Sequence, residues 1–107
     1  MTSVKSPLAA GRNGETLHLK PEADLVASTV EAQRAAMMKA LESVPGEVVL
    51  DLSGVEQIDS LGITLVLGLF KTCQKAGIPF SIGGVKADLM RVFRLFNLPK
   101  FFPIGER

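Results

Sequence analysis

The residues with the clearest chemical signal lie where a predicted strand ends and a helix begins. Asp51, Ser53, Asp59 and Ser60 all fall within residues 48–62, a run typical of strand, short loop and helix. Ser60 stands in the first turn of that helix, where unpaired backbone N–H groups and the helix dipole favour an anion. A phosphoryl group on Ser60 would bring about −1.5 to −2 charges to this point. The position of Ser60 would therefore suit the negative charge of a phosphoryl group.

The same two residues also have a purely structural interpretation. A serine or aspartate at the N-cap of a helix contributes roughly 1 kcal/mol of stability. Either Asp59 or Ser60 can fill that position. The two interpretations are compatible, because one residue can cap the helix while Ser60 remains accessible.

Enzyme chemistry finds little support among the other residues. The chain has one histidine, His18 on a predicted strand, and one cysteine, Cys73 in the middle of a predicted helix. Neither a metal-ligand spacing nor a glycine-rich phosphate loop is present, and Gly83-Gly84 before Lys86 fits a plain turn. The sequence therefore predicts a protein that binds another protein, is not an enzyme, and needs no cofactor and no metal.

Composition limits the partner and the compartment. The chain has 107 residues, 47% of them apolar, and 12 basic against 11 acidic side chains, so we expect one folded domain and no nucleic acid partner. Residues 1–59 carry a net charge of −4 (five basic, nine acidic) and residues 60–107 one of +5 (seven basic, two acidic). The basic second half suits an acidic partner or is simply a solvated face.

The sequence also predicts a cytoplasmic protein without membrane insertion. Residues 1–7 lack the apolar region of a signal peptide, and the apolar run 61–70 has about half the length that a bilayer crossing needs. Cys73 has no second cysteine to pair with, which fits a reducing compartment.

Hydropathy patterns predict the first half as a hairpin, a helix and a strand. Residues 1–7 are polar and we expect them to be mobile, so that the domain spans residues 8–107. Asn13-Gly14 predicts a type I′ turn between strands at 8–12 and 15–20. A helix is expected from Ser28 or Thr29, either of which can cap it, to about Val44. The apolar run 48–52 is typical of a central strand buried on both faces.

Helices and strands alternate in the second half. The predicted elements are a helix over 60–76, a strand over 80–82, a helix over 86–96 and a strand over 101–104. In the third helix Leu89, Val92, Phe93 and Phe96 form one apolar face, and Pro103 confines the last strand to an edge. The order β-β-α-β-α-β-α-β predicts a single α/β domain whose mostly parallel sheet is flanked by helices and begins with an antiparallel hairpin.

Residues 48–62 and the helix after them resemble the STAS domain, specifically that of bacterial anti-sigma factor antagonists. The matching motifs are Asp51-Leu52-Ser53 at the end of an apolar strand and Asp59-Ser60-Leu61-Gly62 at a helix start. The resemblance reaches back to Glu22-Ala23-Asp24 and forward to Phe101. Leu61, Thr64 and Pro21 depart from the family pattern, which usually has a small residue at the first position and often glycine at the other two.

This resemblance implies a phosphorylation switch. The serine matching Ser60 is the phosphorylation site, and the partner is an anti-sigma factor that is also a serine kinase of the ATP-binding histidine-kinase-like fold. The unmodified protein binds this partner and releases a sigma factor. The resemblance also places Asp59 beside the acceptor and Asp24 in a loop near the same surface.

The predicted binding surface comprises Asp24, Asp59, Ser60, Leu61, Gly62 and Ile63. Leu61 and Ile63 are included because the helix is apolar on nearly every side, so that some of its apolar groups must face outward. The alternative is that both fill the core.

A second function remains open within the same family. The chain could be a non-phosphorylated STAS subunit of a bacterial lipid-transport ABC complex, in which the domain packs on the ATPase. Genomic neighbourhood separates the two, because a kinase-like anti-sigma gene favours the switch and permease and ATPase genes favour the transporter.

Overall fold

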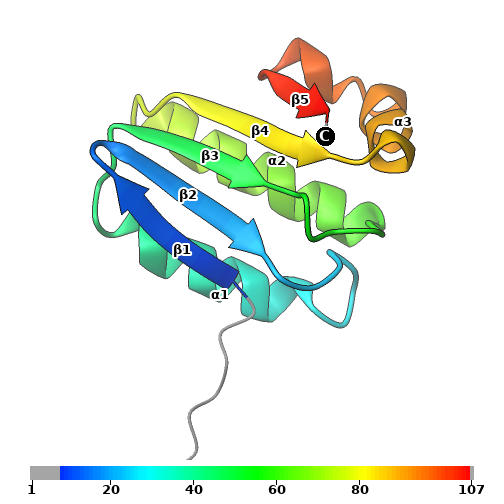
Figure 1. Ribbon diagram of the computed structural model, residues 1–107, viewed down its shortest axis with the longest axis horizontal. Helices are drawn as coiled ribbons and strands as arrows, with labels where there is room; N and C mark the ends of the chain where they lie inside the picture. The colour runs from blue at the N-terminus through cyan, green and yellow to red at the C-terminus, as the bar shows by residue number, and fades with distance from the viewer. Residues whose placement is uncertain (1–7, 107) are drawn as a thin grey trace, which may run out of the picture.

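A five-stranded sheet with helices packed on one face forms the framework of the molecule (Figure 1). The computed structural model describes residues 8–106, so the expected mobility of residues 1–7 lies outside the described residues. The elements are β1 (Leu8–Asn13), β2 (Thr16–Pro21), α1 (Val30–Leu41), β3 (Glu47–Asp51), α2 (Ser60–Lys75), β4 (Phe80–Val85), α3 (Ala87–Leu95), the 3-10 helix η1 (Leu98–Lys100) and β5 (Ile104–Glu106). The predicted α/β class and element order are confirmed.

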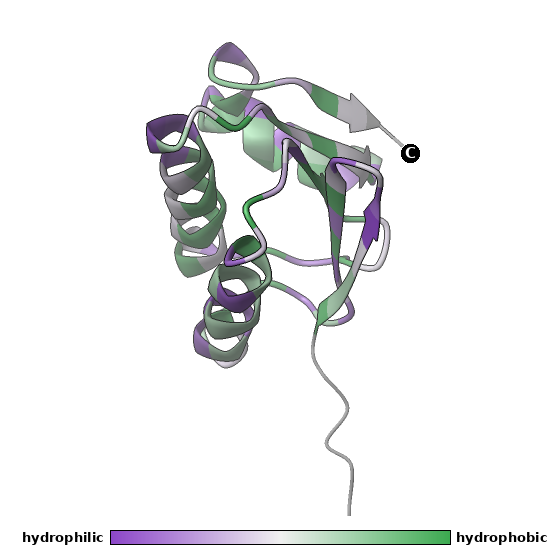
Figure 2. Cartoon of the chain, turned by 90° about the vertical axis from the view of Figure 1, so that its left-hand side faces the viewer, coloured by the Kyte–Doolittle hydropathy of each residue, from purple (hydrophilic) through white to green (hydrophobic). Residues whose placement is uncertain are grey.

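The strands lie in the sheet in the order in which they occur in the chain. β1 and β2 are antiparallel, and β2, β3, β4 and β5 are parallel to one another. Each crossover advances by one strand in the same direction. Right-handed crossovers of this kind place their helices on the same face of the sheet. Figures 1 and 2 show α1 and α2 side by side on one face.

The one-sided arrangement corrects the prediction for β3. Val48 and Leu50 point toward the helices and are fully buried, but Val49 points to the other face and is only half-buried. A continuous apolar run therefore did not mean burial on both faces. The core lies between the sheet and the helices, with Leu19, Val66, Leu69 and Phe93 fully buried in it.

The predicted hairpin exists, but its turn type differs. Asn13 pairs with Thr16, so the two loop residues are Gly14 and Glu15. Of these only Gly14 has a positive φ, +63°. A type I′ turn needs positive φ at both positions, whereas type II′ needs it at the first only. The turn thus has the φ pattern of type II′.

α1 begins at Val30, after the predicted cap position Thr29, but it ends earlier than its apolar pattern predicted. Thr29 occupies the N-cap position without a side-chain bond into the helix. The helix ends at Leu41, and Val44, expected on the buried face, is 74% exposed with a φ of +48°. Its N–H donates to the carbonyl of Leu41 (3.0 Å), three residues back, so that the last turn tightens instead of continuing as α-helix.

The C-terminal strand begins later than predicted, at Ile104 rather than at residue 101. The N–H of Phe101 donates to the carbonyl of Leu98 (2.9 Å), which continues the turn of η1 past this residue. Phe102 instead packs in the core, its ring centroid 5.1 Å from that of Phe70 and also 5.1 Å from that of Phe80. Phe96, expected on the buried face of α3, lies past its last residue and is 50% exposed.

Candidate functional site

Two loops meet at the carboxyl ends of β2 and β3 and form the surface on which the predicted site lies. Residues 22–29, which we call the first loop, connect β2 to α1. Residues 52–59, the second loop, connect β3 to α2. Leu25 forms a parallel bridge with Ile58. The N–H of Leu25 donates to the carbonyl of Gln57 (3.1 Å), and the carbonyl of Leu25 accepts the N–H of Asp59 (3.1 Å). The backbones of two loops that are far apart in the sequence are thereby paired.

Asp59 caps α2 and reaches the other loop at the same time. One carboxylate oxygen, Oδ1, accepts the N–H of Gly62 (2.9 Å), as expected of an N-cap. The other, Oδ2, accepts the N–H of Ala27 (2.8 Å). The Gly62 N–H, with a smaller contribution from that of Ala27, holds the pKa of Asp59 below its ordinary value of 3.8. Of the two candidate caps that the sequence left open, the structure selects Asp59.

Asp24 makes the reciprocal connection from the first loop. Its Oδ1 accepts the N–H groups of Glu56 (2.8 Å) and Gln57 (3.1 Å), both in the second loop. Its backbone carbonyl accepts the hydroxyl of Thr29, which also accepts the N–H of Val26 (3.1 Å) and so holds the first loop in its turn. Asp24 therefore lies at the surface where the resemblance placed it.

Ser60 is the first residue of α2 and its side chain is exposed. Among the described residues, its hydroxyl has no hydrogen-bond partner. Its backbone carbonyl accepts the hydroxyl of Thr64 (2.9 Å). The hydroxyl is thus free to meet another molecule while the backbone beneath it is held by the helix and by the Asp59 cap.

Gly62 and Ile63 face inward and build the site without presenting side chains to a partner. A Cβ added to Gly62 would lie 2.1 Å from the carbonyl oxygen of Leu25 and 2.6 Å from Ile58 Cγ1. Only glycine lets α2 approach the first loop this closely. Ile63 is 3% exposed and belongs to the core. The expectation of an outward-facing Ile63 is corrected, because its position on α2 points toward the sheet.

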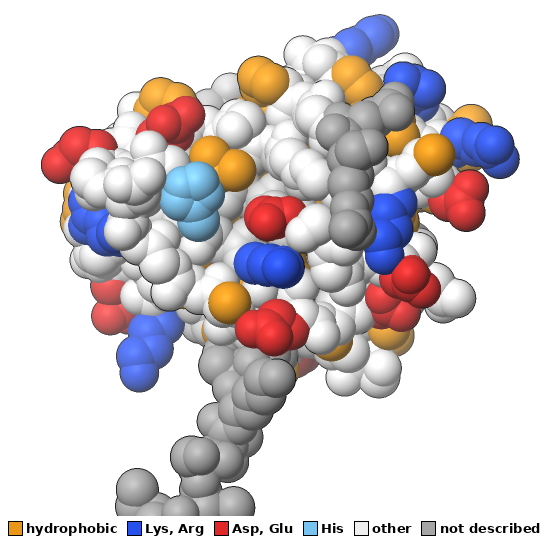
Figure 3. Space-filling model, in the orientation of Figure 1, with side chains coloured by type: hydrophobic (Ala, Val, Ile, Leu, Met, Phe, Trp, Pro, Cys, Tyr) orange, Lys and Arg blue, Asp and Glu red, His pale blue; other side chains and the backbone are white. Residues whose placement is uncertain are grey.

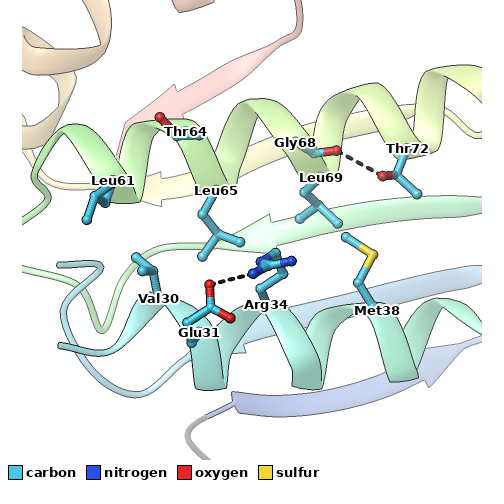
Figure 4. A pocket seen from close by; sticks show the side chains of 10 residues that line it. All are labelled: Val30, Glu31, Arg34, Met38, Leu61, Thr64, Leu65, Gly68, Leu69 and Thr72. Atoms are coloured by element: carbon cyan, nitrogen blue, oxygen red, sulfur yellow. Dashed lines mark hydrogen bonds and ion pairs between the residues drawn. The ribbon is translucent and has the colours of Figure 1, made fainter. Parts of the chain in front are cut away.

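Leu61 is the apolar residue of this turn that does face outward, with 49% of its surface exposed. It lies at one end of a groove of about 490 Å³ between α1 and α2 (Figure 4). In this view Leu65 and Leu69 of α2 point toward Val30 and Met38 of α1. The groove is lined by Val30, Glu31, Arg34, Met38, Leu61, Thr64, Leu65, Gly68, Leu69 and Thr72.

The groove carries no unbalanced charge. Its two charged residues, Glu31 and Arg34, form an ion pair with each other. The hydroxyls of Thr64 and Thr72 donate to backbone carbonyls one turn earlier (2.9 Å each), so that they are already satisfied. The groove is therefore an apolar surface beside Ser60. The sequence carries one signal for the groove, Gly68, because a glycine inside a predicted helix leaves the helix surface without a side chain at that point.

The Asp51-Leu52-Ser53 motif has a structural role beneath the site. Asp51 Oδ1 accepts the N–H of Ser53 (2.9 Å) and turns the chain out of β3. A Cβ on Gly84 of β4, whose φ is +70°, would lie 2.6 Å from the same oxygen. Farther out in the loop, Glu56 forms an ion pair with Lys86 (2.9 Å) ahead of α3. These contacts fix the path of the second loop.

Among the described residues, the structure brings together neither a Cys–His pair nor a metal site. His18 is exposed on the open face of the sheet, and Cys73 is buried in α2, where burial raises the pKa of its thiol. Within residues 8–106, no group of three or more His, Cys, Asp or Glu side chains is placed to hold a metal ion. No helix of the same part of the chain is long and apolar enough to cross a bilayer.

Comparisons with known proteins agree with this architecture. Among solved structures, an anti-sigma factor antagonist from Mycobacterium paratuberculosis has a TM-score of 0.84 and 20% identity, covering 94% of this chain and 85% of that one. The anti-sigma factor antagonist SpoIIAA in its unphosphorylated form has a TM-score of 0.69 and 19% identity, covering 94% and 87%. At these identities the likenesses show the fold.

A curated relative matches a shorter stretch at higher identity. It is the intermembrane phospholipid transport system binding protein MlaB of Escherichia coli, 34% identical over 58 residues, which are 54% of this chain and 60% of that protein. The match thus spans only about three-fifths of the length of this curated relative. A family model described as the STAS domain matches residues 8–107. The chain belongs to the STAS domain family.

Proposed function

We propose that this protein is a phosphorylation-switched regulator that binds an anti-sigma factor, itself a serine kinase with the ATP-binding histidine-kinase-like fold, and thereby releases a sigma factor. Ser60 is the phosphorylation site, and the protein acts by binding and not by catalysis. Cytoplasmic location belongs to the same proposal. The observation that carries it is the exposed hydroxyl of Ser60, which has no hydrogen-bond partner within residues 8–106, on a helix start that two aspartates hold in place.

A kinase needs a hydroxyl that it can reach and a backbone that presents it in one position. Ser60 meets both needs, because its side chain is exposed and the Asp59 cap and the Leu25 pairing fix the backbone around it. Serines elsewhere in the site are less suitable. Ser53, for example, is only half-exposed and lies in the turn held by Asp51.

The binding surface extends from Ser60 over Leu61 into the α1–α2 groove. Exposed apolar surface beside a polar site is typical of an interaction surface. Gly62 and Ile63 contribute by shaping this surface from below, and Asp24 and Asp59 by holding its two loops together. All six residues of the predicted surface thus have a place in the proposal.

Phosphorylation would act on binding more than on the fold. The new charge sits at a helix N-terminus, which favours it by about 0.3–1 kcal/mol at an exposed site, while the nearby Asp59 carboxylate opposes it. At the partner interface the same charge must lose water against apolar groups such as Leu61. An unpaired buried charge is unfavourable by several kcal/mol, enough to release the partner.

The test begins with a pull-down from the native cell and mass spectrometry to identify the partner. Incubation with that partner and ATP is expected to add about 80 Da, one phosphoryl group, and Ser60→Ala is expected to abolish the addition. Ser53→Ala is the matched control and is expected to be modified normally. Phosphate on Ser53 or Thr64 with Ser60 unmodified would contradict the assignment.

A second candidate function rests on the 34% identity to MlaB. In that case the protein is a STAS subunit of a lipid-transport ABC complex, packs on its ATPase, and is not phosphorylated. The same pull-down separates the two, because it would recover an ATPase and permease and no kinase. The exposed Ser60 hydroxyl favours the phosphorylation switch.

A further inference from the structure

A second exposed patch lies at the end of α3 and on η1. We call it the α3–η1 patch, and it comprises Arg91, Arg94, Leu95, Phe96, Lys100 and Phe101. Its three apolar side chains are unusually exposed, Leu95 at 80%, Phe96 at 50% and Phe101 at 55%. Three of the five large hydrophobic residues reported as exposed in the described chain are therefore in this one region.

The charge of this region has one sign. Residues 89–105 contain Arg91, Arg94 and Lys100 and no aspartate or glutamate. The acidic residues that border this range in the sequence are Asp88, in the first turn of α3 at the end opposite Leu95, and Glu106, in β5. A cation in a last turn, such as Arg94, is common because it faces the negative end of the helix dipole. That explanation accounts for a charge but not for bulky apolar side chains left in water beside it.

The charged and apolar groups are neighbours. Arg91 and Leu95 are four residues apart on α3 and so lie on the same face of the helix. η1, which carries Lys100, packs against α3. Figure 3 shows Lys, Arg and hydrophobic side chains intermixed, with an acidic side chain beside them, over the part of the surface formed by α3 and η1. Phe101 is held in place by the ring of Phe70, 6.2 Å away between centroids.

The shape of the patch favours a membrane surface over a protein partner. Phe101 lines the groove around Phe80, but Leu95 and Phe96 line neither that groove nor the groove between α1 and α2. Both side chains project from the surface instead of receiving something into it. A protein partner usually seats its anchors in pockets. Projecting apolar groups surrounded by cations are typical of a protein that rests on an anionic membrane.

We propose that the α3–η1 patch binds the surface of a bilayer rich in anionic phospholipid. Arg91, Arg94 and Lys100 lie against the headgroups, and Leu95, Phe96 and Phe101 enter the headgroup region. The contact is peripheral and no segment crosses the membrane. It does not depend on the Ser60 switch, so either proposal can fail without the other.

Co-sedimentation of the full chain with vesicles tests the proposal. The probes are phosphatidylcholine vesicles with and without phosphatidylglycerol, at low salt and at about 0.5 M NaCl, where the Debye length is only a few ångströms. We expect binding to the anionic vesicles at low salt and loss of at least about tenfold in affinity at high salt, because part of the attraction is screened. No binding to anionic vesicles, or equal binding to neutral ones, would overturn it.

Three variants make the test specific. Arg91→Glu reverses one charge and Leu95→Ser removes one apolar group, and each is expected to weaken vesicle binding by about fivefold or more. Val44→Ser, which changes another exposed apolar residue (74% exposed) outside the patch, is the matched control and is expected to bind normally. Equal binding by all three variants would overturn the assignment.

Two further measurements test whether a variant is misfolded and whether the patch binds an acidic peptide instead of lipid. Circular dichroism melts show whether Leu95→Ser is folded, and if it is not, Arg91→Glu alone decides. A soluble polyglutamate peptide replaces the vesicles in a parallel titration. Binding to this peptide with the same dependence on Arg91, without binding to vesicles, would assign the patch to an acidic protein segment and overturn the lipid proposal.

Discussion

Asp24 and Asp59 each hold the loop to which the other belongs. Asp24, in the β2–α1 loop, accepts the N–H groups of Glu56 and Gln57 in the β3–α2 loop. Asp59, at the end of the β3–α2 loop, accepts the N–H of Ala27 in the β2–α1 loop. With the Leu25–Ile58 bridge between them, the two carboxylates form a reciprocal clamp. The clamp fixes the helix start that carries Ser60.

The clamp predicts a specific coupling between the two aspartates. Asp24→Ala is expected to lower the free energy of unfolding by about 1.5–3 kcal/mol, the range for hydrogen bonds to a charged group. Asp59→Ala is also expected to destabilise the protein. The double variant is expected to lose less than the sum of the two, because both carboxylates hold the same pair of loops. Urea denaturation of the four proteins measures this, and strict additivity would show that the aspartates act independently.

The stability of the clamp is expected to depend on pH through Asp59. Its folded pKa lies below the ordinary value of 3.8, mainly because of the Gly62 N–H. The charged carboxylate therefore contributes stability that is complete above the unfolded pKa and is lost as the pH falls through the folded pKa. Melting curves between about pH 6 and pH 2 are expected to show this loss, and Asp59→Asn to reduce it. Asp88→Asn, in α3, is the control and should leave the dependence on Asp59 intact.

Two glycines of α2 are expected to respond to alanine in opposite ways. Gly62→Ala places a Cβ 2.1 Å from the backbone oxygen of Leu25, so α2 or the first loop must move, and we expect a loss of about 1–3 kcal/mol. Gly68→Ala meets nothing within 4 Å, and we expect a gain of up to about 1 kcal/mol from helix propensity. Thermal and urea denaturation compare them. A stable Gly62→Ala protein would mean that the close approach to Leu25 is not required.

Leu61 and Ile63 separate binding from folding. Leu61→Ser removes a half-exposed side chain and is expected to weaken partner binding by tenfold or more while the protein remains folded. Ile63→Ala creates a cavity in the core and is expected to lower stability by about 2–5 kcal/mol. Partner titrations and denaturation curves give both quantities. If Leu61→Ser binds like the unmodified protein, the surface around Leu61 is not the interface.

Phosphorylation of Ser60 is expected to change affinity far more than stability. Binding should fall by more than about tenfold, since each 1.4 kcal/mol corresponds to that factor, while the melting temperature moves by only a few degrees. Ser60→Asp supplies one charge and should reproduce part of the effect. Paired melts and titrations of unmodified, phosphorylated and Ser60→Asp protein measure it. Unfolding of α2 on phosphorylation, or unchanged affinity, would contradict the electrostatic mechanism.

The sequence by itself determined the order of the elements and singled out the helix start that carries the candidate site. Alternation in residues 15–20, the three- to four-residue periods of the helices and the strand-to-helix change at 51–60 are local patterns, and local backbone preferences decide them. Ser60 was recognisable for the same reason, because a helix start is written in a few consecutive residues. The least certain boundaries were at turns, where Gly14, Val44 and Phe101 adopt conformations that neighbouring contacts select.

Only the tertiary structure decided which residues of the candidate site are exposed and which contacts hold them. The bonds from Asp24 to Glu56 and from Asp59 to Ala27 join residues 32 positions apart, and no local pattern can encode such a pairing. The strands lie in the sheet in chain order, which places α1 and α2 on the same face of the sheet. Ile63 therefore lies in the core, and Leu61 lies at the surface. The groove between those helices exists for the same reason. Contacts between distant segments depend on how all the elements pack at once, which sequence periodicity does not contain.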